Sequence, residues 1–312
     1  ASSEINPIIS FLKNQIYFIL GIVLSLSFLI SFILSEKITQ PITSLVNATK
    51  RIKEGDFDNS DLEKINTHDE FTTLSKSFID MTIGLKEREK YLNVLNKFHG
   101  QEITHEIISN PHITNAKKSK MTVLFTDLRN FTSLSENMEP EETVLFLNDY
   151  FASMIKIIKA NGGIIDKFIG DAIMAVWGAP YPSEEDAQNA VKACLEMRET
   201  LKEINQKRAL TGLAPIEMGM GLHTGEAVSG VIGSDERLEY TVIGDTVNTA
   251  SRIESATKEF KTDILMSETT QKEIKLFHPT QFLGDVSLKG KQEKVSLYRL
   301  PAWSENKLKN VA

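Results

Sequence analysis

The 312-residue sequence is poor in cysteine, in histidine and in net positive charge. Its one cysteine, Cys194, excludes an intrachain disulfide. Six scattered histidines and a single cysteine form no cluster with the spacing of zinc ligands. Asp and Glu number 42 against 35 Lys and Arg, which gives a net charge of −7. Because a phosphate-backbone surface needs clustered Lys and Arg, we expect no nucleic-acid partner.

Charge is also missing from one long run near the N-terminus. No residue between Lys13 and Glu36 is charged, and the run contains IYFILGIVLSLSFLISFIL. This is about the length that a helix needs to cross a bilayer. The alternatives are a buried globular helix, which would not be apolar on all sides, and a signal peptide, which would precede a small-residue cleavage site. We expect a transmembrane helix over residues 14–35, after a short extracytoplasmic segment over 1–13.

Basic residues flank this run unevenly, and the asymmetry predicts its orientation. Lys13 lies upstream, and the downstream residues are Lys37, Lys50, Arg51 and Lys53. Cytoplasmic flanks of membrane helices carry the excess of Lys and Arg. The prediction is a chain anchored in the lipid bilayer of the cell or inner membrane, with its C-terminal bulk in the cytoplasm.

Residues 36–88 contain two segments whose apolar residues recur every three and four positions, as in a coiled-coil seam. The first seam consists of Ile42, Leu45, Thr49 and Ile52, and the second of Phe71, Leu74, Phe78, Met81 and Leu85. Pro41 suits a helix start, and a polar connector that ends in Asp69-Glu70 separates the segments. This arrangement resembles a HAMP domain, which as a dimer forms a parallel four-helix coiled coil. A plain coiled-coil stalk is the alternative.

Beyond a linker helix expected over residues 89–116, the pattern changes to alternating strands and helices. The expected elements are a strand at 121–128, a helix at 139–160, a hairpin within 162–179, a helix that follows Ser183, strands within 216–233 and 238–245, and a helix at 246–256. The order βαββαβ predicts an α+β, ferredoxin-like domain over 117–303, with helices on one face of an antiparallel sheet. Residues 304–312 are expected to form a C-terminal tail.

Two aspartates stand where apolar strands end. Asp127 follows the apolar run VLF, and Asp171 occupies a Gly-Asp turn between two apolar segments. In a βαββ unit the end of the first strand and the next hairpin turn can lie side by side. Two carboxylates there would repel each other unless a cation lay between them, and hard oxygen ligands favour Mg²⁺ or Mn²⁺. Ordinary turn caps are the alternative interpretation.

Four motifs follow one another in the C-terminal part of the chain. They are FTDLRNFT, KFIGDAIMAVWG, GLHTGEAVSGVIG and YTVIGDTVNTASRIES. In this order and spacing they resemble a class III nucleotidyl cyclase catalytic domain, over residues 117–303. In that family, two Mg²⁺ or Mn²⁺ ions per site bind where Asp127, Leu128 and Asp171 stand here.

The resemblance also assigns residues to the parts of a nucleotide. The phosphate-binding positions are Arg129, Asn130, Phe131 and Thr132 in the turn after the first strand, together with Lys289 and Arg237. The backbone of that turn is expected to present N–H groups to the β- and γ-phosphates. Asn248 and Arg252, four apart on one helix, match the catalytic pair that positions the ribose and stabilises the transition state.

Lys167 and Thr241 match the positions that contact the purine. Adenine offers N1 as an acceptor and N6 as a donor, while lysine only donates and a threonine hydroxyl can accept, so this pair fits adenine. The commoner pairing in the family is Lys with Asp, and guanylate cyclases have Glu and Cys.

The resemblance therefore predicts a homodimeric adenylate cyclase that converts ATP to cyclic AMP and pyrophosphate. In this family the metal aspartates come from one subunit, and the ribose, purine and transition-state residues from the other. The alternatives are a guanylate cyclase and a non-catalytic nucleotide-binding regulator. A diguanylate cyclase would need a GGDEF-like turn, and IGDAI is not one.

Overall fold

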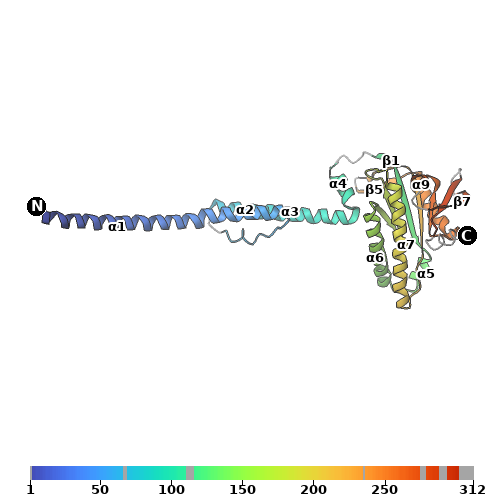
Figure 1. Ribbon diagram of the computed structural model, residues 1–312, viewed down its shortest axis with the longest axis horizontal. Helices are drawn as coiled ribbons and strands as arrows, with labels where there is room; N and C mark the ends of the chain where they lie inside the picture. Colours follow the sequence, from blue (N-terminus) through green and yellow to red (C-terminus); the bar gives the residue numbers. More distant parts are fainter. Residues whose placement is uncertain are drawn as a thin grey trace. The chain divides into compact units, whose positions relative to one another are not determined.

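The computed structural model describes residues 2–65, 69–109, 116–234, 236–274, 279–287 and 294–301. The chain divides into two compact units, Ala1–Val94 and Leu95–Ala312, which are described separately (Figure 1).

The first unit begins with helices that follow one another without a break. Helix α1 spans Ser2–Leu34, a π-helical segment η1 spans Ser35–Thr39, and helix α2 spans Gln40–Lys53. Pro41 lies in the first turn of α2, as expected, but no break separates this helix from the helical segments before it. The N–H of Gln40 donates to the carbonyl of Ser35, five residues back, and this wider turn carries the helix past the proline, which has no N–H to donate.

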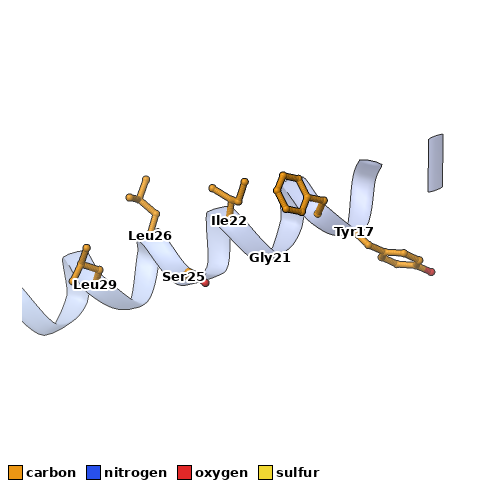
Figure 2. A pocket seen from close by; sticks show the side chains of 7 residues that line it. Tyr17, Gly21, Ile22, Ser25, Leu26 and Leu29 are labelled. Carbon is orange, nitrogen blue, oxygen red and sulfur yellow. The ribbon is translucent and has the colours of Figure 1, made fainter. Parts of the chain in front are cut away.

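Helix α1 supplies the apolar segment that the sequence predicted. The continuous helix Phe11–Lys53 contains a window of mean hydropathy 2.6, so by length and composition it is apolar enough to cross a membrane. Figure 2 shows one side of it, where the small Gly21 and Ser25 lie between larger side chains. The larger residues labelled there are Tyr17, Ile22, Leu26 and Leu29.

A connector and helix α3 (Glu70–His99) follow α2. The Ser75 hydroxyl donates to the carbonyl of the buried Leu62, at 2.7 Å, which fixes the connector against α3. Arg51 at the end of α2 forms an ion pair with Asp61 of the connector, at 2.9 Å. The seam residues Ile42, Leu74 and Met81 remain exposed in the single chain.

The second unit contains a mixed sheet with helices. Its elements are α4 (Gln101–Ser109), β1 (Lys117–Leu128), α5 (Phe131–Ser135), α6 (Pro140–Ala160), β2 (Ile164–Ile169), β3 (Ala172–Trp177), α7 (Asp186–Leu210), β4 (Met218–Ser234), β5 (Arg237–Ile243), α8 (Asp245–Glu259), β6 (Ile264–Ser267), α9 (Glu268–Glu273), β7 (Gln281–Val286) and β8 (Val295–Arg299). The strand order is β2-β3-β1-β4-β6-β8-β7, and β5 pairs with β4. The predicted α+β class and the order β1-α6-β2-β3-α7-β4 are confirmed.

The arrangement of the helices differs from the expectation in two respects. Helices α6 and α7 pack with Leu124 and Leu128 of β1, whereas α8 packs with Val123 and Phe125, which alternation places on the opposite face. Helices therefore cover both faces of the sheet. The sheet is also not wholly antiparallel, because β4 and β6 run parallel. The α8 segment connects these strands, as parallel neighbours require a crossover rather than a hairpin.

Helix α8 lies unusually close to β4, and a glycine permits this. A Cβ atom on Gly221 would lie 2.1 Å from the backbone nitrogen of Glu254 and 2.8 Å from the carbonyl oxygen of Ala250. Both are backbone atoms, so no side-chain rotation can make room.

We predict that Gly221→Ala lowers the free energy of unfolding of the second unit by about 2 kcal/mol or more, because α8 must move away from the sheet. Thermal unfolding of the full chain followed by circular dichroism measures the effect. Gly84→Ala is the matched control, since an added Cβ at that helical position meets nothing within 4 Å. Equal unfolding midpoints for the Gly221 variant and the parent chain would contradict the close packing.

Candidate active site

The register of three strands brings Asp127 and Asp171 to one end of the sheet. In the β1–β3 pairing Thr126 lies opposite Ile173, so the residues that follow Asp127 reach the turn that holds Asp171. That turn contains only Gly170 and Asp171, because Ile169 pairs with Ala172. The backbone N–H of Leu128 donates to the Asp171 carboxylate at 3.1 Å. The structure thus places the two carboxylates side by side, as the spacing predicted.

The proximity of the two carboxylates changes the pKa of Asp171. Burial, a hydrogen bond with Asp127 and the charge of Asp127 together raise the pKa of Asp171 to about 6. A cation between the carboxylates would remove this repulsion, and Mg²⁺ is usually held by one or two carboxylates together with substrate phosphates. No group of three or more His, Cys, Asp or Glu side chains that could hold a metal occurs among the described residues. The donor set fits a hard divalent cation shared with a phosphate-bearing ligand.

Two charged residues of α8, Glu254 and Lys258, lie beside Asp127 at this end of the sheet, and the sequence did not point to either. Lys258 lies 3.5 Å from the Asp127 carboxylate. Glu254 is 7 % exposed and packs over Gly219, the partner of Asp127 in β4. Burial and the charge of Asp127 raise the pKa of Glu254. One face of α8 therefore lies beside Asp127 of its own chain.

The turn after β1 is only partly available to a phosphate. The N–H of Leu128 is taken by Asp171, and that of Arg129 donates to the carbonyl of Glu217 at 2.8 Å. The Arg129 guanidinium donates to the carbonyls of Thr257 and Thr262, at 3.2 and 2.6 Å. These bonds leave the segment 130–132, at the start of α5, as the part of the turn that can face an anion. Asn130 there adopts a left-handed conformation, with φ of 56°.

Lys167 and Thr241 meet through an aspartate that the sequence analysis missed. The Thr241 hydroxyl donates to Asp166 Oδ2 at 2.9 Å, and the N–H of Val242 donates to Asp166 Oδ1 at 3.1 Å. Lys167 Nζ lies 3.6 Å from Asp166 Oδ2 and also pairs with Glu239. Burial raises the pKa of Asp166, and the surrounding donors act in the opposite direction. The two predicted base-contacting residues thus belong to one hydrogen-bonded cluster.

The remaining predicted residues are more scattered. Asn248 and Arg252 share a face of α8, and neither side chain has a hydrogen-bond or ion-pair partner among the described parts of the chain. Arg237 is exposed at the start of β5, opposite Ser234. Lys289 lies outside the described residues.

Comparison with known proteins gives two family matches. Residues 113–302 match the adenylate and guanylate cyclase catalytic domain, and residues 33–87 match the HAMP domain. Among curated proteins, the adenylate cyclase of Anabaena cylindrica is 34 % identical over 297 residues, which are 89 % of this chain and 57 % of that protein. Adenylate cyclase 1 of Rhizobium meliloti is 29 % identical, over 90 % of this chain and 41 % of that protein. The chain thus spans about half the length of these relatives.

Solved structures resemble the second unit. The adenylyl cyclase CyaB from P. aeruginosa is 37 % identical with a TM-score of 0.57, and the match covers 60 % of this chain and 96 % of that one. The guanylyl cyclase Cya2 is 39 % identical with a TM-score of 0.54, over 59 % of this chain and 93 % of that one.

We predict that Asp171→Asn stabilises the metal-free protein at pH 7.5. The folded pKa of Asp171 lies above its unfolded value, so its ionisation destabilises the fold as pH rises from about 4 to 6. Solvent screening at this half-buried site reduces the effect. We expect the substitution to raise the free energy of unfolding by about 1 kcal/mol at pH 7.5, and this gain should disappear near pH 4. An amide oxygen can still accept the N–H of Leu128.

Thermal unfolding in the presence of a chelator, at both pH values, measures this difference. Asp149→Asn, at an exposed position on α6, is the matched control and should change neither midpoint. A stabilisation of the Asp171 variant that is equal at pH 4 and pH 7.5 would exclude carboxylate repulsion as its cause.

Proposed function

Because its match over residues 113–302 makes the chain a member of the adenylate and guanylate cyclase family, we propose that it is an adenylate cyclase. It would convert ATP to 3′,5′-cyclic AMP and pyrophosphate. The observation that carries the proposal is the carboxylate pair Asp127–Asp171, together with a purine-contacting cluster in the same domain.

The choice of ATP over GTP rests on Lys167 and Thr241. Overall identity does not decide it, since the named adenylyl and guanylyl cyclase structures are similarly related to the chain. The lysine offers only donors to adenine N1, and the threonine oxygen can accept from N6. Guanine presents N1 as a donor, which lysine, itself only a donor, cannot satisfy.

Asp127 and Asp171, with the backbone of Leu128 between them, would hold two Mg²⁺ or Mn²⁺ ions per site. The carboxylate oxygens fit this role because a cation would relieve their mutual repulsion and because hard oxygen ligands suit Mg²⁺ and Mn²⁺. When bound, such ions neutralise phosphate charge and lower the pKa of the attacking hydroxyl.

The chain's own residues would position ATP and stabilise the charge that develops. The segment 130–132 and Lys289 would hold the β- and γ-phosphates, with Arg237 as a further contact. Asn248 would orient the ribose so that its 3′-oxygen bonds to the α-phosphorus while the bond to the β-phosphate oxygen breaks. Arg252 would donate to the α-phosphate oxygens as their charge increases. Positioning and electrostatics carry this mechanism, and no side chain is assigned as a general base.

The geometry of α8 favours a site shared between two chains. Glu254 and Lys258 lie on the face that contacts Asp127. Arg252 is two residues from Glu254, or about 200° around the helix, and Asn248 shares the Arg252 face. The catalytic pair therefore points away from the aspartates of its own chain, which favours Asp127 of a second copy as its partner.

Exposed apolar residues favour the same homodimer. Around the purine-contacting cluster, Phe168, Leu238 and Ile243 are 47, 56 and 51 % exposed. In the first unit, Ile42, Leu74 and Met81 of the two coiled-coil seams are also exposed. Burial of such surface against a second copy is favourable, and heptad seams pair helices in this way.

The apolar helix and the HAMP match together indicate a membrane-anchored protein. We place the catalytic domain in the cytoplasm, because four basic residues follow the span and one precedes it.

The first test is product identification. The purified 312-residue chain, incubated with Mn²⁺ and either ATP or GTP, should form cyclic AMP from ATP much faster than cyclic GMP from GTP. A preference for GTP would refute the purine assignment, and nucleotide binding without a cyclic product would identify a non-catalytic regulator.

The double change Lys167→Glu and Thr241→Cys should lower the ATP-over-GTP preference by about tenfold or more. The GTP activity gained should be small, because the new carboxylate would face Asp166 and Glu239.

The second test is complementation between inactive variants. Asp127→Ala and Arg252→Ala should each reduce the rate by about 10²–10³ or more. When the two variants are co-expressed with different tags and the mixed dimer is isolated, one intact site should form and activity should return. An isolated mixed dimer that remains inactive would falsify the shared site.

A further inference from the structure

A β-bulge in β2 brings two successive side chains to the same side. Ile165 pairs with Ala175 and Lys167 with the adjacent Met174, so Asp166 is an extra residue in the ladder. Successive side chains of a regular strand point to opposite faces. Here Asp166 contacts Thr241 while Lys167 contacts Glu239, and these two partners are separated by two positions on β5. Bulges redirect side chains in this way, often beside functional sites.

The carboxylate of Asp166 is fully engaged inside the domain. Its side chain is 4 % exposed, Oδ1 accepts the N–H of Val242, and Oδ2 accepts the hydroxyl of Thr241. A backbone N–H can only donate, and an ionised carboxylate can only accept. The polarity of the Thr241 hydroxyl is therefore determined: its single proton points to Asp166, and its lone pairs remain for another donor.

We propose that Asp166 is a positioning residue for purine selection, which fixes Thr241 as a hydrogen-bond acceptor and holds Lys167 beside it. The proposal rests on the adenylate cyclase function and deepens it. A free threonine hydroxyl could donate to guanine O6 as readily as it accepts from adenine N6. With its proton bound to Asp166, the hydroxyl presents lone pairs to O6, and two acceptors that face each other leave a buried polar group unsatisfied.

Asp166→Asn tests this polarity with almost no change in side-chain volume. The amide must present its oxygen to the N–H of Val242, so its NH₂ group faces Thr241 and donates to the hydroxyl oxygen. The Thr241 proton is then directed toward the base. We expect the ratio of kcat/KM for ATP to that for GTP to fall about tenfold in the full-length protein, chiefly through the loss of ATP turnover.

An ATP analogue separates base recognition from general damage. Purine riboside 5′-triphosphate lacks the exocyclic amino group and cannot donate to Thr241. Asp166→Asn should therefore affect its turnover much less than that of ATP. An equal loss with both nucleotides would show that Asp166 only supports the fold and would overturn the proposal. Asp149→Asn is the matched surface control, with an unchanged ATP:GTP ratio.

Two further variants keep the test decisive. In a Thr241→Val background, Asp166→Asn should not change the ATP:GTP ratio further, because the hydroxyl through which it acts is gone. If Asp166→Asn does not fold, Asp166→Ala is the second variant. It leaves the Thr241 hydroxyl free to donate or accept, rather than directing its proton toward the base, so it should lower the ATP:GTP ratio to a smaller extent.

Failure of this inference can be distinguished from failure of the proposed function. A wild-type preference for ATP that Asp166→Asn leaves intact overturns only the role of Asp166. A wild-type preference for GTP overturns the purine assignment itself. If no cyclic product forms, calorimetry can measure the dissociation constants of ATP and GTP instead. A ratio of these two constants that is the same in Asp166→Asn and in the parent chain would again contradict the proposal.

Discussion

The repulsion between Asp127 and Asp171 is the constraint around which the catalytic domain is organised. The pairing of β1 with β3 forces the carboxylates together, although burial and like charge both oppose the ionisation of Asp171. The fold offsets part of this through the N–H of Leu128 and the ammonium group of Lys258. What remains is a repulsion that a bound cation would relieve. Its affinity for metal would come from repulsion already present in the folded chain.

Helix α8 connects this constraint to the proposed dimer. It approaches β4 closely because Gly219 and Gly221 have no side chains, and this places Glu254 and Lys258 near Asp127. The same rigid helix then directs Asn248 and Arg252 to a different side. Because the periodicity of a helix cannot bring both sets to one point, the packing of this helix favours the composite site that we propose. Any motion that changes how two chains meet would alter catalysis without changing either half-site.

Under the proposed function, the cluster of Asp166, Lys167 and Thr241 illustrates how small a structural difference would separate two substrates. ATP and GTP share every feature except the groups on the base, and relatives named for each nucleotide are almost equally similar to this chain. Discrimination must therefore come from the direction of a few hydrogen bonds. A hydroxyl is ambiguous as a donor or an acceptor, and a buried carboxylate behind it removes the ambiguity.

Local patterns in the sequence determined the helices and strands from β1 to β4 that make up the βαββαβ order, the apolar span, the Gly170-Asp171 hairpin and the residues that carry the cyclase resemblance. These features depend on periodicity, turn chemistry and residue type, all of which can be read from residues that are close together in the sequence. Tertiary structure alone decided that α8 covers the second face of the sheet, that the Arg129 guanidinium binds carbonyls inside the domain, and that Asp166 joins Thr241 to Lys167. Strand alternation places Asp166 and Lys167 on opposite faces, and only the bulge reverses this. A bulge depends on how a strand pairs with its neighbour, and that pairing exists only in the folded sheet.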